Sequence, residues 1–181
     1  MAAQKITDLD AATTVADSDQ FLVTANPGSS PTSKKVNADV ALRLSHANVS
    51  VTGGSASQSL TGSTWTKVTQ FTAESNYNST TTASHSNDRI TVANAGQYLA
   101  TWMCSFTGAT TSEYRLAIYY NSAIVLVPAI ITTSSTDEHC VTVSVPINVT
   151  SGGNHVEAYV HADGDKAFAV KESALTVTRV A

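Results

Sequence analysis

Charged residues are scarce in this chain of 181 residues, at 13%, compared with roughly 25% in an ordinary soluble domain. The formal net charge is −4, and Lys34-Lys35 is the only pair of adjacent basic residues. A protein that binds nucleic acid needs clustered Lys and Arg to displace counterions from phosphates. We therefore predict no nucleic-acid partner, and we expect much neutral surface that can be buried against other subunits.

Long hydrophobic runs are also missing. The longest one, residues 123–131, is interrupted by Pro128 and falls well short of the roughly 20 apolar residues that span a bilayer. The first residues, Met-Ala-Ala-Gln-Lys, contain no apolar stretch of the kind found in a secretory signal. We therefore predict no membrane contact and synthesis in a cytoplasm.

The chain has two cysteines, too few for a disulfide framework. Cys104 falls in a run in which apolar residues recur at every second position: Tyr98, Ala100, Trp102, Cys104 and Phe106. Such alternation is typical of a half-buried strand, so we predict that Cys104 is a small buried hydrophobic residue. A bridge between Cys104 and Cys140 is the alternative.

Sequence motifs of common enzymes are absent: there is no Gly-x-Ser-x-Gly, no P-loop and no His-Glu-x-x-His. One group of residues could supply metal ligands, namely His155, Glu157, His161, Asp163 and Asp165. However, Asp163-Gly164-Asp165 is also an ordinary turn sequence, and exposed strands commonly carry His and Glu. We predict that the protein is not an enzyme and that it binds neither metal nor cofactor.

What the chain does contain, from Val49 onward, is β-strand pattern. Thr and Val are frequent, and apolar and polar residues alternate with a period of two. Turn sequences such as Asn121-Ser122 separate about eight to ten short strands, a spacing typical of an all-β sandwich or barrel. The polar segment 74–87 is predicted to be a long exposed loop or a weak edge strand.

The first 46 residues have a different character. Two short runs, at 20–24 and 33–36, flank a loop that contains Pro and Gly, which predicts a hairpin. Asn37 is a plausible N-cap for a short helix on which Val40 and Leu44 lie one turn apart. We therefore predict an N-terminal arm, residues 1–46, that is too small to be stable alone, and a single β-domain, residues 47–181.

The segment from Gly96 to Trp102, with Ile90 before it, resembles the signature of the C1q/TNF-like jelly rolls, an apolar residue followed by Gly-x-Tyr-x-aromatic-x-aromatic. Ala100 stands where the first aromatic is expected, and the closing residues 175–180 resemble the last strand of that family. The resemblance covers roughly the last 130 residues. It implies a ten-stranded jelly roll that forms a trimer with aromatic residues around the threefold axis. The candidates for this trimer interface are Tyr98, Trp102, Tyr119 and Tyr120; an ordinary place in the core is the alternative for each.

The arm resembles a second kind of sequence. Ile6-Thr7-Asp8-Leu9, then Ala16 to Val23, then Lys34-Lys35-Val36 are similar to an element near the start of tailed-phage virion proteins, where it precedes a fibre, a spike or a capsid-bound domain. An arbitrary hairpin followed by a helix is the alternative.

Together the two resemblances imply a phage capsid decoration (cement) protein. It would be a homotrimeric jelly roll on the exterior of the virion, made in the host cytoplasm, whose arm binds the major capsid protein. The arm residues predicted to make this attachment are Ile6, Leu9, Phe21, Leu22, Val40 and Leu44.

A second functional class also fits the sequence. A tail fibre, a spike or a receptor-binding tip would dock on the tail through the arm and contact a host surface glycan through exposed aromatics such as Tyr77 or Tyr114. A cellular C1q-like binding protein is a third possibility, but it would need a secretory signal and would leave the arm unexplained.

Overall fold

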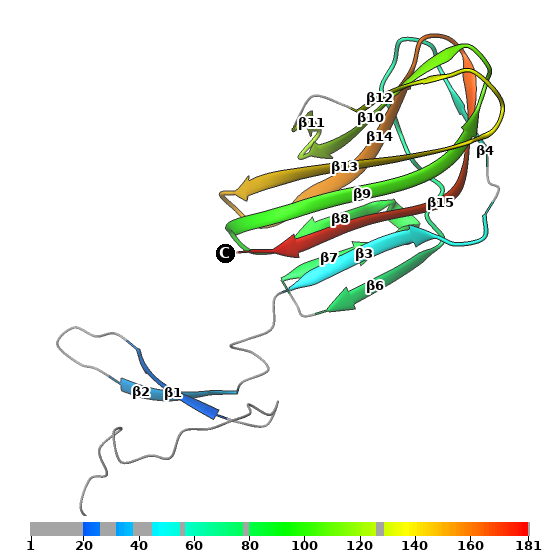
Figure 1. Ribbon diagram of the computed structural model, residues 1–181. Helices are drawn as coiled ribbons and strands as arrows, with labels where there is room; N and C mark the ends of the chain where they lie inside the picture. The colour runs from blue at the N-terminus through cyan, green and yellow to red at the C-terminus, as the bar shows by residue number, and fades with distance from the viewer. Residues whose placement is uncertain are drawn as a thin grey trace, which may run out of the picture. The chain divides into compact units, whose positions relative to one another are not determined.

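The computed structural model describes residues 20–25, 32–37, 45–54, 57–77, 80–125 and 129–180 (Figure 1). The contacts within the chain divide it into two units, residues 1–43 and 44–181. In the first unit, β1 (Gln20–Ala25) and β2 (Thr32–Asn37) pair antiparallel, with Gln20 opposite Asn37. This confirms the predicted hairpin.

Most of the other predictions for the arm concern residues that the structure does not describe. The predicted helix after Asn37 lies outside the described residues, as do Ile6, Leu9, Val40 and Leu44. Phe21 and Leu22 belong to β1. The attachment role of all these residues therefore stays a prediction.

The second unit is built from two antiparallel sheets. The sheet that we call the β9 sheet has the order β13-β9-β15-β3-β6, with β4 paired to β15; the β10 sheet has the order β11-β10-β14-β8-β7, with β12 paired to β10 and β5 to β14. The strands of the β9 sheet are β3 (His46–Val51), β4 (Ser57–Leu60), β6 (Ala73–Tyr77), β9 (Gly96–Gly108), β13 (Glu138–Val149) and β15 (Lys166–Arg179). Those of the β10 sheet are β5 (Thr66–Lys67), β7 (Thr81–Ser84), β8 (Arg89–Val92), β10 (Ser112–Tyr120), β11 (Ala123–Ile124), β12 (Ala129–Thr133) and β14 (Asn154–Ala162).

The long strands alternate between the two sheets along the chain. β9 lies in one sheet and β10 in the other, and β13, β14 and β15 alternate in the same way (Figure 1). Such alternation places two sheets face to face around one core, as in a jelly roll. The predicted all-β jelly-roll sandwich is confirmed.

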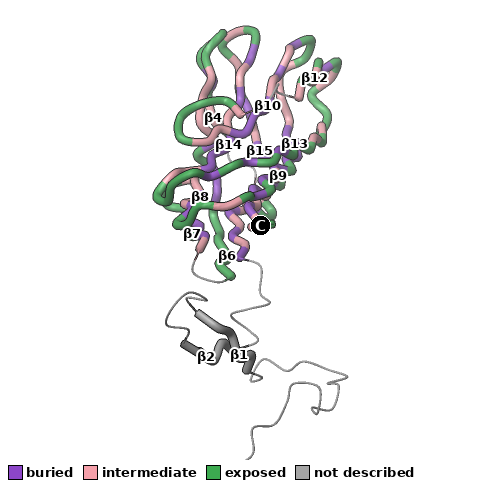
Figure 2. Tube along the Cα trace, turned by 90° about the vertical axis from the view of Figure 1, so that its left-hand side faces the viewer, coloured by how far each residue is buried: buried purple, intermediate pink, exposed green. Residues whose placement is uncertain are grey.

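The core lies between the sheets because each long strand buries every second side chain. Buried and exposed positions alternate along the strands in Figure 2. Among the largest fully buried side chains are Trp102, Tyr98, Tyr114, Phe106 and Phe168. Their polar atoms are satisfied: Trp102 Nε1 donates to Ser173 Oγ at 2.8 Å, and Tyr114 Oη donates to the Ala167 carbonyl at 2.9 Å. Large apolar area thus enters the core without leaving these donors unpaired.

The polar segment 74–87 forms the edges of the sheets rather than a loop. All residues of β6 are exposed at the edge of the β9 sheet, and β7, followed by a 3₁₀ turn (His85–Asn87), is the edge of the β10 sheet. Side chains of β6 bind the next segment: Asn76 Oδ1 accepts the Ala83 N–H at 2.5 Å, and Glu74 Oε2 accepts the His85 N–H at 2.6 Å. The latter bond lowers the pKa of Glu74. Of the two predicted alternatives, the weak edge strand is the one observed.

Cys104 is buried and Cys140 is exposed, and both are free thiols. The predicted burial of Cys104 is confirmed, and the alternative disulfide is wrong. Within the described part of the chain, no helix is long and apolar enough to cross a membrane.

Candidate functional site

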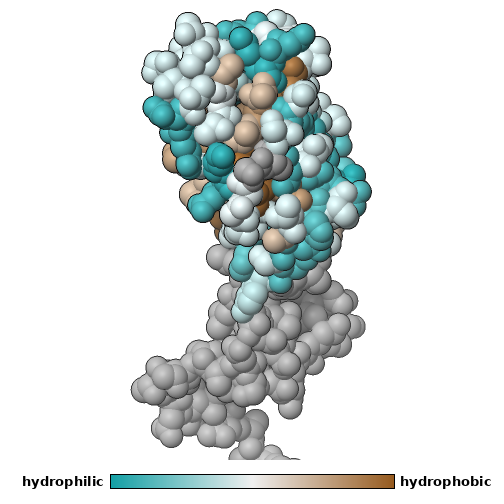
Figure 3. Space-filling view, turned by 90° about the vertical axis from the view of Figure 1, so that its right-hand side faces the viewer, coloured by the Kyte–Doolittle hydropathy of each residue, from teal (hydrophilic) through white to brown (hydrophobic). Residues whose placement is uncertain are grey.

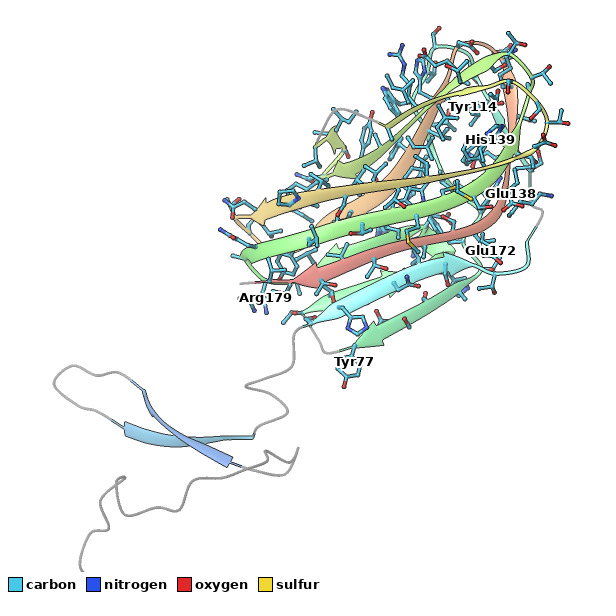
Figure 4. The ribbon with its side chains drawn as sticks, viewed as in Figure 1. Tyr77, Tyr114, Glu138, His139, Glu172 and Arg179 are labelled. Carbon is cyan, nitrogen blue, oxygen red and sulfur yellow. The ribbon has the colours of Figure 1, made fainter. Side chains whose placement is uncertain are left out.

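The outward surface of the β9 sheet carries almost no charge. Because side chains alternate along a strand, the residues between the buried positions of β3, β9, β13 and β15 point away from the core. We call the uncharged ones away from the ends of the strands the neutral face: Asn48, Ser50, Leu99, Thr101, Met103, Thr142, Ser144, Pro146, Ala174, Thr176 and Thr178. Figure 4 shows Glu138 and Glu172 near one end of this sheet and Arg179 near the other.

Two large apolar side chains lie exposed on the neutral face. Leu99 is 41% exposed and Met103 is 54% exposed. Leu99 lies opposite Pro146 on β13, and Met103 lies opposite Ala174 on β15. The strand register therefore surrounds each of them with small or apolar neighbours, and this surface loses little by leaving water.

The polar groups of the neutral face bond to one another. The hydroxyls of Thr101 on β9 and Ser144 on β13 are 2.9 Å apart. Asn48 Nδ2 on β3 donates to Thr176 Oγ1 on β15, also at 2.9 Å. Hydroxyl and amide groups that already have partners cost less to bury than free ones.

A groove of about 420 Å³ opens at one end of the neutral face. It is lined by Met103, Cys140, Thr142, Ala174 and neighbouring residues of β3. The pairing of β15 with β9 shifts by one residue between Val170 and Glu172, which is a β-bulge. The bulge lies beside the groove, since Glu172 is one of the lining residues.

The groove does not hold an activated nucleophile at Cys104. Burial raises the pKa of the Cys104 thiol to about 12, so the thiolate that reacts is not formed near neutral pH. Nearby, the Ser105 hydroxyl donates to the Glu138 carboxylate. The neutral face is better suited to contact with another surface than to chemistry.

The three carboxylates considered as metal ligands, Glu157, Asp163 and Asp165, have other partners. Among the described residues, no group of three or more His, Cys, Asp or Glu side chains could hold a metal ion. Glu157 pairs with Lys67 at 2.6 Å, and Asp165 Oδ1 accepts the Gly62 N–H at 2.7 Å. Asp163 Oδ2 accepts the Glu113 N–H at 3.1 Å. The two aspartates therefore tie turns together.

The aromatics predicted for the trimer interface do not meet on one surface. Tyr98 and Trp102, at 1% and 0% exposure, are buried in the core of a single chain and have no surface to offer a neighbour. Tyr119 and Tyr120 lie on β10, in the other sheet, and are partly exposed. The prediction that Tyr98 and Trp102 lie at the trimer interface is therefore wrong, and both are core residues.

The sequence does contain the signal for the neutral face. Leu99, Thr101 and Met103 occupy the alternate positions of the strand that buries Tyr98 and Trp102. The aromatic side of this alternation drew the trimer prediction, whereas the opposite side of the same strand carries no charged residue.

The two tyrosines predicted to contact a glycan differ in their exposure. Tyr114 is 0% exposed and packs against Phe106 and Phe168 in the core, which makes the prediction for it wrong. Tyr77 is 43% exposed at the end of β6 (Figure 4). Its ring stacks on His46, with ring centres 5.0 Å apart.

Comparison with known proteins supports the fold. No protein-family model matches the chain, and no curated protein is similar to it in sequence. The globular domain of zebrafish complement 1qA is similar in structure, with a TM-score of 0.54 at 14% identity over 76% of this chain and 98% of that one. Murine APRIL has a TM-score of 0.50 at 14% identity over 76% of this chain and 100% of its own. PRD1 vertex protein P5 has a TM-score of 0.48 at 17% identity, over 76% of this chain and 97% of its own. The domain has a C1q/TNF-like jelly-roll fold.

Proposed function

We propose that this protein is a capsid decoration (cement) protein of a tailed phage. The jelly-roll domain forms a homotrimer on the outside of the virion, and the N-terminal arm, residues 1–46, binds the major capsid protein. The observation that supports the assembly part is the neutral face, an uncharged sheet surface with Leu99 and Met103 exposed on β9.

Burial of the neutral face is favourable for a simple physical reason. Full burial of a Leu or Met side chain is worth about 1.5–3 kcal/mol, and roughly half of each side chain remains to be buried, since Leu99 is 41% and Met103 is 54% exposed. No charged group of the face has to lose its hydration. A closed trimer joins two different surfaces of neighbouring subunits, and the neutral face supplies one of them.

The arm is supported as the attachment element by its sequence and by its small size. Its sequence resembles the element that precedes capsid-bound domains in phage virion proteins. An isolated two-stranded hairpin such as β1–β2 is at best marginally stable in water, so a partner surface would stabilise it. Three arms on one trimer bind with avidity, because after the first contact the others are at high effective concentration.

The test is removal of residues 1–43. Ser45 must stay, because its side chain is buried and its carbonyl accepts the Arg179 N–H at 2.8 Å. The shortened chain should keep its oligomeric mass in solution and should no longer sediment with capsid shells of the parent phage. A full-length chain with residues 1–43 in shuffled order is the matched control and should also fail to bind. Undiminished binding by either variant would contradict the role of the arm.

A tail fibre, a spike or a receptor-binding tip is the alternative, and one observation favours it: partly exposed aromatic rings gather on the β10 sheet. Electron micrographs of virions labelled with an antibody separate the two functions. A decoration protein is labelled over the whole shell, whereas a tail protein is labelled at a single vertex.

A further inference from the structure

Four rings on the β10 sheet are linked by three ring contacts, in the order His161, Trp65, Tyr119 and Tyr159. We call Trp65, Tyr119, Tyr159 and His161 the aromatic cluster. Tyr119 and Tyr159 are stacked, with ring centres 3.9 Å apart. The Trp65 ring is tilted against Tyr119 at 5.9 Å and against His161 at 5.4 Å. The rings come from three separate segments, β10, β14 and the residue before β5, so tertiary structure assembles the cluster.

The aromatic cluster belongs to the surface and not to the core. All four residues are partly exposed, whereas the core aromatics are fully buried. Ala117 lies directly opposite Tyr159 and shares its side of the sheet, yet it is 0% exposed. Larger side chains around Ala117 therefore cover it.

Each ring on β10 or β14 has a charged residue directly opposite it on a neighbouring strand. Tyr119 lies opposite Glu157, Tyr159 opposite Lys67, and His161 opposite Arg115. Cross-strand neighbours of this kind lie close enough to contact one ligand together.

These charges are balanced within the chain. Lys67 Nζ is 2.6 Å from Glu157 Oε1, and Arg115 Nε is 2.5 Å from Glu113 Oε1. Because each cation already has a carboxylate, the site offers hydrogen-bond donors and acceptors without a net charge.

The cluster includes polar groups as well as ring faces. His161 Nδ1 is buried without a hydrogen-bond partner among the described residues. Burial raises the pKa of both Tyr119 and Tyr159, so both phenols keep their protons and can donate hydrogen bonds at neutral pH.

We propose that the aromatic cluster is a binding site for a neutral oligosaccharide. A sugar ring has a face of polarised C–H groups, which is attracted to the negative face of an aromatic ring. Its edge carries hydroxyls, which match the donors and acceptors of Lys67, Glu157 and Arg115. Mostly aromatic sites with a few placed polar groups are typical of small-ligand recognition.

Other ligands fit these residues less well. Nucleic acid requires cations that are free to pair with phosphates, and both cations here are paired. A wholly apolar partner would remove water from two ion pairs without offering them hydrogen bonds, which is costly. The site lies on the β10 sheet and the neutral face on the β9 sheet, so this proposal does not depend on trimer formation or on capsid binding.

The test is titration of the full chain with cellohexaose, maltohexaose, mannohexaose and chitohexaose, followed by calorimetry and by Trp fluorescence. At least one of these sugars should bind and should protect Trp65 from quenching by acrylamide; Trp102 is fully buried and contributes little to the quenching. Trp65→Ala and Tyr119→Ala should each weaken binding by about tenfold or more. Trp65→Phe keeps a ring and should restore most of the affinity.

The matched control is His46→Ala, which removes a partly exposed ring on β3, outside the cluster, and should leave affinity unchanged. Absence of binding by all four sugars at millimolar concentration would overturn the proposal. Binding that survives both Trp65→Ala and Tyr119→Ala would overturn it as well. A change of oligomeric mass in these variants, with no sugar bound by the parent chain, would instead make the cluster a contact between subunits.

Discussion

At the scale of single residues, adjacent side chains of β9 alternate between the core and the surface. Trp102 fills the core, where its indole N–H donates to Ser173 Oγ at 2.8 Å, and Ser173 Oγ donates in turn to the Met103 carbonyl at 3.2 Å. Met103, one residue further on, is 54% exposed. Because side chains alternate in a strand, one strand can stabilise the domain with one side and offer a contact surface with the other.

Ser173→Ala should destabilise the domain, because it leaves the buried Trp102 N–H without an acceptor. The expected loss is about 1–3 kcal/mol in the free energy of unfolding, measured by urea denaturation. Ser144→Ala removes an exposed hydroxyl that bonds only on the surface and should change stability by less than about 0.5 kcal/mol. Equal effects of the two substitutions would contradict the importance of the buried bond.

The two thiols should report on assembly. Cys104 is buried with its pKa raised to about 12, so it should react with a disulfide reagent only after unfolding. Cys140 is exposed in the single chain and lines the groove beside the neutral face. Its reaction should be slow in the assembled protein and fast when assembly is prevented. Equal rates in both states would argue against burial of this surface.

At the scale of elements, the two sheets differ in what their outward sides carry. The β9 sheet presents hydroxyls, small side chains and two exposed aliphatic residues, while the β10 sheet presents rings and ion pairs. Figure 3 shows the domain from the right-hand side of Figure 1. Much of this surface is white, which marks intermediate hydropathy, and the brown hydrophobic atoms form a narrow band. The neutral face itself contains no charged residue.

A charge on the neutral face should prevent assembly. Met103→Glu would place a carboxylate where the interface excludes water, at a cost of several kcal/mol. Analytical ultracentrifugation should show that the variant oligomer dissociates at a concentration at least about a hundredfold higher than the one at which the parent oligomer dissociates. The variant monomer should stay folded. Ile124→Glu is the matched control, since Ile124 is 42% exposed on the other sheet. Equal behaviour of the two variants would place the interface elsewhere.

Much of the fold could be predicted at this scale. Alternation along residues 98–106 predicted a half-buried strand, and the Pro/Gly loop predicted the β1–β2 hairpin, because both depend on local residue pattern. The edge strands β6 and β7 could not be assigned, since their residues are polar and their order comes from bonds such as that between Asn76 and Ala83.

The candidate site was harder to predict than the fold. Aromatic residues such as Trp102 and Tyr114 serve a core and an interface equally well in sequence, and only tertiary burial separates the two roles. The aromatic cluster joins Trp65 to residues more than fifty positions away, through strand pairings that no local pattern reveals.

At the scale of the whole molecule, separate surfaces have separate proposed tasks. We propose that the arm attaches, that the neutral face assembles and that the aromatic cluster binds sugar. These tasks can be removed one at a time, by deletion of residues 1–43, by Met103→Glu and by Trp65→Ala. Each change should leave the two other functions measurable, except that loss of the trimer also weakens capsid binding, because avidity disappears.

The oligomeric mass of the full chain in solution tests the central claim most directly. Light scattering coupled to size exclusion should give three times the chain mass of 18.9 kDa, and the same chain with Met103→Glu should give the mass of one chain. A parent chain that is monomeric at micromolar concentration would contradict the proposed assembly through the neutral face.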